Sequence, residues 1–78
     1  MRSALAAEYA VLGVLAPGGL LTVDQLASNA GITTWAARAA VTRLERRGLI
    51  VDAGRRGRWS ITVRGRGAWV AKGSRFTP

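Results

Sequence analysis

The sequence has 78 residues, enough for one small domain that buries about 60% of the surface its unfolded chain exposes. It contains no cysteine or histidine and only four acidic residues, so it lacks the usual nucleophile activators, general bases and metal ligands of enzymes. We therefore expect no catalysis, no metal and no cofactor. The formal net charge is +8, and the whole excess falls within residues 43–78. A positive field of this kind favours a polyanionic partner, although it can also be a merely solvated surface.

A first helix is predicted over residues 3–16. Its apolar side chains recur at spacings of three and four residues, and Ser3 can cap the first turn. Glu8 lies within this apolar segment, and we expect it to face solvent. Pro17 and the two glycines after it end the helix, because proline lacks an N–H group and glycine costs about 1 kcal/mol in a helix interior.

The same segment has the outline of a signal peptide, since an apolar run follows Arg2 and continues to Ala16. Glu8 interrupts the run, and no small-x-small cleavage site follows it. At about 13 residues the run is also too short to span a bilayer. We therefore expect a cytoplasmic protein.

A second, short helix is predicted after Thr22. Thr22 and Gln25 match a capping box, in which each side chain bonds the backbone of the other residue. Leu26 and Ala27 fall on one side of this helix, and Gly31 ends it as a C-cap. Leu20 and the residue after it form a very short apolar stretch just before the helix.

A third helix is predicted over residues 33–47, with Thr33 or Thr34 as its cap and Gly48 as its end. Ile32 is placed to pack against the helix from just outside it. The helix has two faces. One is an apolar stripe of Ala37, Ala40, Val41 and Leu44, and away from it lie Thr34, Trp35, Arg38, Thr42 and Arg46.

A hairpin follows, with strands predicted over residues 49–51 and 59–63. In the second strand Trp59, Ile61 and Val63 alternate with smaller or polar residues. A turn rich in glycine and arginine joins the strands and carries Arg55 and Arg56 at its tip. Residues 64–72 are expected to form a frayed helical turn or a tail, and residues 73–78 a flexible tail, so the predicted domain spans residues 1–72.

This order of elements predicts a helix-rich α+β protein with a winged helix-turn-helix fold, made of three helices and a two- or three-stranded wing. Three segments resemble MarR-like and related bacterial or phage regulators. These are residues 26–33, with a small-residue turn between helices, the run Arg43-Leu44-Glu45-Arg46-Arg47-Gly48-Leu49-Ile50 and residues 62–67. The resemblance covers residues 5–70, and it implies a DNA-binding domain.

The third helix is the predicted recognition element. Its front, the face that carries Thr34, Trp35, Arg38 and Thr42, can enter a major groove about 12 Å wide while its back, the apolar stripe, stays packed. Arg38 is the best candidate for base recognition, since arginine pairs bidentately with guanine. Thr34 and Thr42 are candidates for contacts with phosphate or a thymine methyl group, and Thr33 is a further candidate DNA-binding residue. Two positions are open for Trp35, which either contacts a sugar or methyl group on the DNA or packs against the second helix.

The remaining candidate contacts are basic. Arg55 and Arg56 are expected to reach a neighbouring minor groove or its phosphates. Further residues expected to bind backbone phosphates are Arg43, Arg46, Arg58, Arg64 and Arg66. With about five phosphates neutralised, the logarithm of the binding constant falls with the logarithm of salt at a slope of about −4.5.

We therefore expect a sequence-specific partner of double-stranded DNA, most simply a repressor that occludes a promoter at the nucleoid. A homodimer through the first helix or the segment around Trp69 is expected, since one small module buries little surface on DNA. No sensing module or long dimerisation helix is evident in these residues, so we expect no small-molecule ligand.

Two alternatives stay open. One is a directionality or architectural factor for recombination, which would bend DNA and bind tandem sites. The other is a protein-interaction module that meets an acidic partner. The Arg-Gly pairs faintly resemble disordered RNA-binding segments, but the alternating apolar residues between them favour ordered strands.

Overall fold

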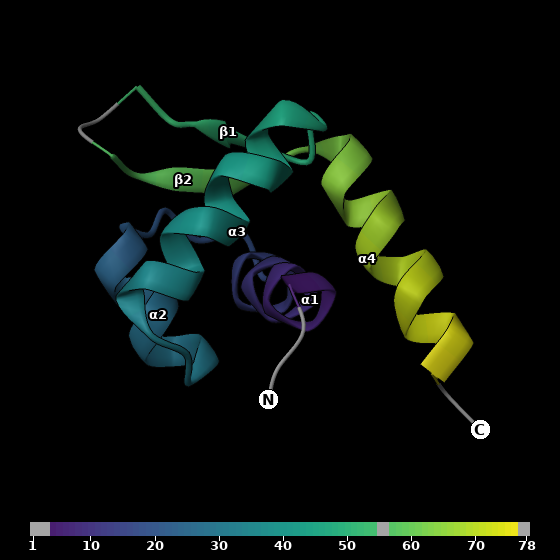
Figure 1. Cartoon of the computed structure of the whole chain (residues 1–78). Coiled ribbons are helices and arrows are strands. Elements are labelled where there is room, and N and C mark those ends of the chain that lie inside the picture. The colour runs from purple at the N-terminus through teal and green to yellow at the C-terminus, as the bar shows by residue number, and fades with distance from the viewer. Residues whose placement is uncertain (1–3, 55–56, 77–78) are drawn as a thin grey trace.

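The computed structural model describes residues 4–54 and 57–76 of the chain. Within them it confirms the predicted helix-rich winged helix-turn-helix arrangement and adds a fourth helix (Figure 1). The elements are α1 (Ala4–Leu15), α2 (Val23–Ala30), α3 (Thr34–Arg46), β1 (Ile50–Asp52), β2 (Trp59–Ile61) and α4 (Val63–Phe76).

The core lies among α1, α2 and α3, and the start of the hairpin closes it. Its largest fully buried side chains are Val11, Leu15, Leu26, Leu44 and Ile50. The hairpin and α4 extend to opposite sides from the C-terminal end of α3, as Figure 1 shows. α3 packs one face into this core, and the hairpin lies beside it.

The predicted caps of α2 and the predicted N-terminal cap of α3 are confirmed. The Gln25 N–H donates to the Thr22 hydroxyl oxygen at 3.2 Å, and the Thr22 N–H donates to the Gln25 side-chain oxygen at 2.9 Å. Gly31 ends α2 in the left-handed conformation with a φ of 69°. Of the two threonines open as the cap of α3, Thr33 takes this place, since its hydroxyl oxygen accepts from the Ala36 N–H at 3.0 Å.

The hairpin is hydrogen-bonded to a residue before α2 through an isolated β-bridge. β1 and β2 pair antiparallel, with Ile50 opposite Ile61 and Asp52 opposite Trp59. Leu21 forms a bridge on the other edge of β2: the Leu21 N–H donates to the Trp59 carbonyl at 3.1 Å, and the Trp59 N–H donates to the Leu21 carbonyl at 2.8 Å. The hairpin is thus hydrogen-bonded to the segment that joins α1 and α2.

The second strand is shorter than predicted. The alternation of Trp59, Ile61 and Val63 indicates a strand through residue 63, but β2 ends at Ile61, and Val63 begins α4 and is 88% exposed. Thr62 provides the physical reason. Its hydroxyl oxygen accepts a hydrogen bond from the Gly65 N–H at 2.9 Å, which caps the first turn of α4.

The C-terminal segment is more helical than predicted. A continuous helix replaces the expected frayed turn or tail and extends through Phe76. The predicted domain boundary after residue 72 falls inside this helix, and the extent of the domain stays a prediction. Ser3, the predicted cap of the first helix, and residues 77–78 at the end of the predicted tail lie outside the described residues.

Close approaches at glycines dock α4 on the rest of the domain. The Trp69 ring stacks on Tyr9 of α1 with centroids 4.5 Å apart. A Cβ atom added to Gly13 would lie 2.8 Å from the end of the Trp69 ring. At Gly65 a Cβ would overlap the Leu49 carbonyl oxygen. Hydrogen in place of a methyl group at both positions lets α4 lie against α1 and the hairpin.

Two glycines of α4 give a matched stability test. We expect Gly65→Ala to lower the free energy of unfolding by about 2 kcal/mol or more, because the new methyl group meets backbone that cannot turn aside. Gly67→Ala meets nothing within 4 Å and should raise stability by about 0.5 to 1 kcal/mol through helix propensity. Urea denaturation followed by circular dichroism measures both, and equal effects would contradict the docking described for α4.

Candidate nucleic-acid interface

The front of α3 is free, as the sequence predicts. Its back is formed by Ala37, Ala40, Val41 and Leu44, all of which are buried. The exposed side carries Thr34, Trp35, Arg38, Thr42 and Arg46. Trp35 is 82% exposed, so it does not pack against α2, because an indole packed there would be covered. Arginine, threonine and indole side chains therefore share one solvent-facing surface.

Two of the predicted threonine contacts have structural partners. The Thr33 hydroxyl oxygen caps α3, and the Thr42 hydroxyl donates to the Arg38 carbonyl at 3.1 Å, one helical turn back. Thr34 is exposed in the first turn. Thr34 and Thr42 are both exposed on α3, whereas Thr33 is its N-cap.

The hairpin presents Arg58 as an exposed basic residue. The turn is held by the Ala53 N–H, which donates to the Arg58 carbonyl at 2.8 Å, and by the Gly54 N–H, which donates to the Asp52 carboxylate at 2.9 Å. Gly54 has a φ of 78°, a conformation that suits glycine. The predicted tip residues Arg55 and Arg56 lie outside the described residues.

Glu8 lies in a different environment from the one that the sequence predicts. Its predicted solvent-facing position is wrong, because it is only 6% exposed. Its carboxylate accepts from Arg43 Nε at 2.8 Å and from Arg47 Nη1 at 2.7 Å. α1 packs across α3, so a carboxylate on this face of α1 meets two arginines spaced by one turn on α3. An acidic residue inside an apolar helical run was the sequence signal for such a pair.

Two of the predicted phosphate contacts have partners within the domain. Arg43 is held by Glu8 in an ion pair between helices. Arg66 donates from Nη1 to the Ala16 carbonyl at 2.6 Å, where a cation favours the negative end of the α1 dipole. Both arginines hold helices together in this structure.

Arg46 and Arg64 come together although they are distant in sequence. One ends α3 and the other lies in the first turn of α4, and both line an open hollow at the surface together with Arg47. Leu49 and Ala68 form the apolar part of its lining. This hollow concentrates positive charge beside the C-terminal end of α3.

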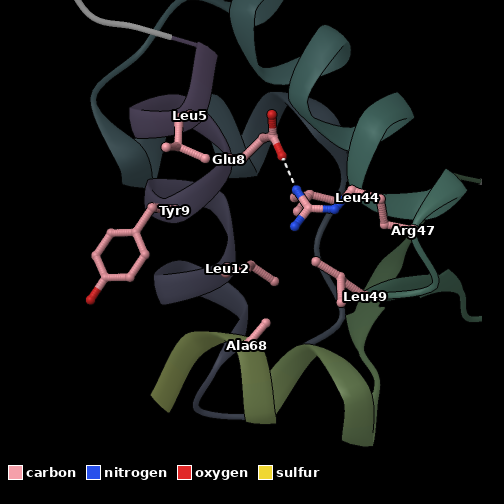
Figure 2. Close-up of a pocket in the computed structure, with 8 residues that line it drawn as sticks. All are labelled: Leu5, Glu8, Tyr9, Leu12, Leu44, Arg47, Leu49 and Ala68. Carbon is pink, nitrogen blue, oxygen red and sulfur yellow. Dashed lines mark hydrogen bonds and ion pairs between the residues drawn. The ribbon is translucent and has the colours of Figure 1, made fainter. Parts of the chain in front are cut away.

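A second, smaller hollow lies between α1, α3 and α4. Figure 2 shows Glu8 and Arg47 at one side of it, joined by their hydrogen bond, with apolar residues around the rest. Its volume is about 30 Å³, which admits one or two water molecules. Pockets for drug-sized ligands have volumes of about 300 Å³ or more.

Two further features of residues 4–54 and 57–76 bear on the class of protein. None of the helices there combines the length and apolar character needed to cross a membrane. Nor do three or more histidine, cysteine or acidic side chains gather there at one point where they could hold a metal ion.

Comparison with solved structures identifies the fold family that this chain resembles. No family model and no curated protein sequence matches the chain. Among solved structures, it superposes on Bordetella bronchiseptica BpsR with a TM-score of 0.79 at 24% identity, covering 88% of this chain and 52% of that one. A MarR family protein of Mycobacterium tuberculosis gives a TM-score of 0.75 at 25% identity, with 87% and 50% covered. The chain has a MarR-like winged-helix fold.

A third structure supports the same assignment. MepR, a transcription regulator of the Staphylococcus aureus multidrug efflux pump MepA, superposes on this MarR-like winged helix with a TM-score of 0.73 at 29% identity, covering 90% of this chain and 56% of that one. The chain thus spans about half the length of the proteins it resembles. DNA binding by BpsR is regulated by 6-hydroxynicotinic acid, which weakens the expectation that no small-molecule ligand acts on a protein of this kind.

The ion pair of Glu8 supplies a second stability test. We expect Glu8→Gln to lower the free energy of unfolding by about 2 kcal/mol, because both arginines lose their counter-charge. The cost stays below the 3 to 5 kcal/mol typical of fully buried pairs, since the arginine tips are partly exposed to water. Urea denaturation at low salt measures it.

The matched control is Glu45→Gln, the same change at an exposed position of α3. It should shift stability by no more than about 0.5 kcal/mol. Equal effects of the two substitutions would show that the Glu8 pair contributes nothing beyond a surface charge.

Proposed function

We propose that this MarR-like winged helix binds double-stranded DNA at specific sequences and regulates transcription. The observation that carries the proposal is the front of α3, where Trp35, Arg38 and Thr42 project from a helix whose back is buried. A helix exposed in this way fits the major groove. The similarity to solved transcription regulators supports the same function.

The charge distribution supports binding to the DNA backbone. Arg46, Arg58 and Arg64 are exposed, and they lie at the end of α3, in the hairpin turn and in the first turn of α4. With Arg55 and Arg56 of the hairpin turn, they make about five candidate phosphate contacts, which corresponds to a salt slope of about −4.5. The wing would then contact the neighbouring minor groove or its phosphates.

Repression by occlusion of a promoter is the simplest mode of action for such a domain, acting at the nucleoid in the cytoplasm. Two copies on a palindromic site would double the number of base and phosphate contacts, which favours a homodimer on DNA. Catalysis forms no part of the proposal. A footprint of tandem sites with strong bending would instead indicate a recombination factor, and failure to bind any duplex at low salt would indicate a protein-interaction module.

Arg38 tests the orientation of α3. Once the preferred duplex has been selected from genomic fragments, Arg38→Ala should reduce discrimination at one base pair per half-site by about 1 to 3 kcal/mol. Arg38→Lys retains the charge and loses the bidentate geometry, so it should lose the same discrimination and retain most of the non-specific affinity. Fluorescence anisotropy on matched and single-substituted duplexes measures both.

Arg58→Ala is the contrasting variant on the hairpin. It should weaken binding to every duplex alike and reduce the salt slope by about 0.9, because it removes one phosphate contact. Unchanged affinity and base preference in Arg38→Ala would mean that this face of α3 does not meet the bases.

A further inference from the structure

Trp35 stands apart from the other tryptophans of the chain. Trp59 and Trp69 are partly buried and pack against the core, whereas Trp35 is 82% exposed. A tryptophan side chain offers 150 to 250 Å² of mostly apolar surface in typical proteins. An indole left in water on the face that carries Arg38 is therefore available for an apolar contact with whatever that face binds.

The position of Trp35 limits what it can touch. It lies in the first turn of α3, and residues near the start of a recognition helix approach the base edges. Arg38 follows three residues later and Thr42 seven residues later, so the three side chains share the front of the helix. Trp35 thus faces the floor of the groove when Arg38 does.

The chemistry of the major groove then selects the contact. Base faces are stacked on each other, and the base edges present hydrogen-bond donors and acceptors with one apolar exception, the C5-methyl group of thymine. 5-Methylcytosine places a methyl group at the same ring position. The indole has one N–H donor and cannot pair bidentately as Arg38 can.

We propose that Trp35 is a specificity-determining residue that binds a pyrimidine C5-methyl group beside the base recognised by Arg38. This inference rests on the proposed function. Three residues of α-helix rise about 4.5 Å, and base pairs are spaced by about 3.4 Å. The methyl group therefore belongs within about two base pairs of the base that Arg38 recognises.

Removal of single methyl groups tests the proposal. In the selected duplex, each thymine is replaced in turn by uracil, which deletes only the methyl group. We expect one position per half-site, within two base pairs of the position sensitive to Arg38→Ala, to lose about fourfold in affinity, as expected for one buried methyl group. The Trp35→Ala variant should bind the thymine duplex and the uracil duplex with equal affinity.

A second arm separates the two sources of the methyl group. The sensitive base pair is changed to C·G, and unmethylated and C5-methylated cytosine are compared. The methylated duplex should bind the wild-type chain about fourfold more tightly and the Trp35→Ala variant equally. A gain from thymine with none from 5-methylcytosine would restrict the contact to thymine.

Two controls make the outcomes distinct. Trp35→Ala removes an exposed side chain, so its thermal unfolding should match that of the wild type, and Val63→Ala, at an exposed position on α4, should leave DNA affinity unchanged. If no uracil replacement changes the affinity, while Arg38→Ala still loses base discrimination, the proposed role of Trp35 is wrong and the proposed function still stands. Failure of the wild-type chain to bind any duplex overturns both.

Discussion

The ion pair between Glu8 and two arginines fixes the position of α3 in this domain. Glu8 is buried on α1, while Arg43 and Arg47 reach it from the flank of α3. The apolar stripe of α3 decides which face turns inward, but an apolar stripe alone tolerates rotation and sliding. Two charge-assisted hydrogen bonds at 2.8 and 2.7 Å have directional requirements, and they specify how α3 lies across α1. Trp35 and Arg38 are exposed because they lie away from the stripe that α3 buries.

The same pair changes how the basic charge of the chain is distributed. Arg43 pairs with Glu8 and Arg66 bonds the Ala16 carbonyl, so part of the basic charge of the chain also makes contacts within the domain. The arginines left on the surface near α3 belong to the helix end, the hairpin and the start of α4. Positive charge in the second half of the sequence thus serves the fold and the candidate interface together.

Local signals allowed prediction of the helix-turn-helix unit, and tertiary contacts account for what was missed. The capping box at Thr22 and the stripe of α3 depend on neighbours within a few residues, so they are visible in sequence. The Glu8 pair joins residues 35 and 39 positions apart, and the Arg66 contact spans 50 positions, which no periodicity records. In α4, the glycines argue against a helix, yet packing on α1 outweighs propensity there.

The bridge between Leu21 and Trp59 has a consequence for any duplex that binds. Because β2 is hydrogen-bonded both to β1 and to the connection before α2, the base of the hairpin cannot swing independently of the helices. The spacing between the recognition helix and the hairpin base is then a fixed property of the protein. Duplexes whose grooves do not match this spacing have to be overtwisted or undertwisted on binding, so torsional stiffness of the DNA would contribute to selectivity at base pairs that no side chain touches.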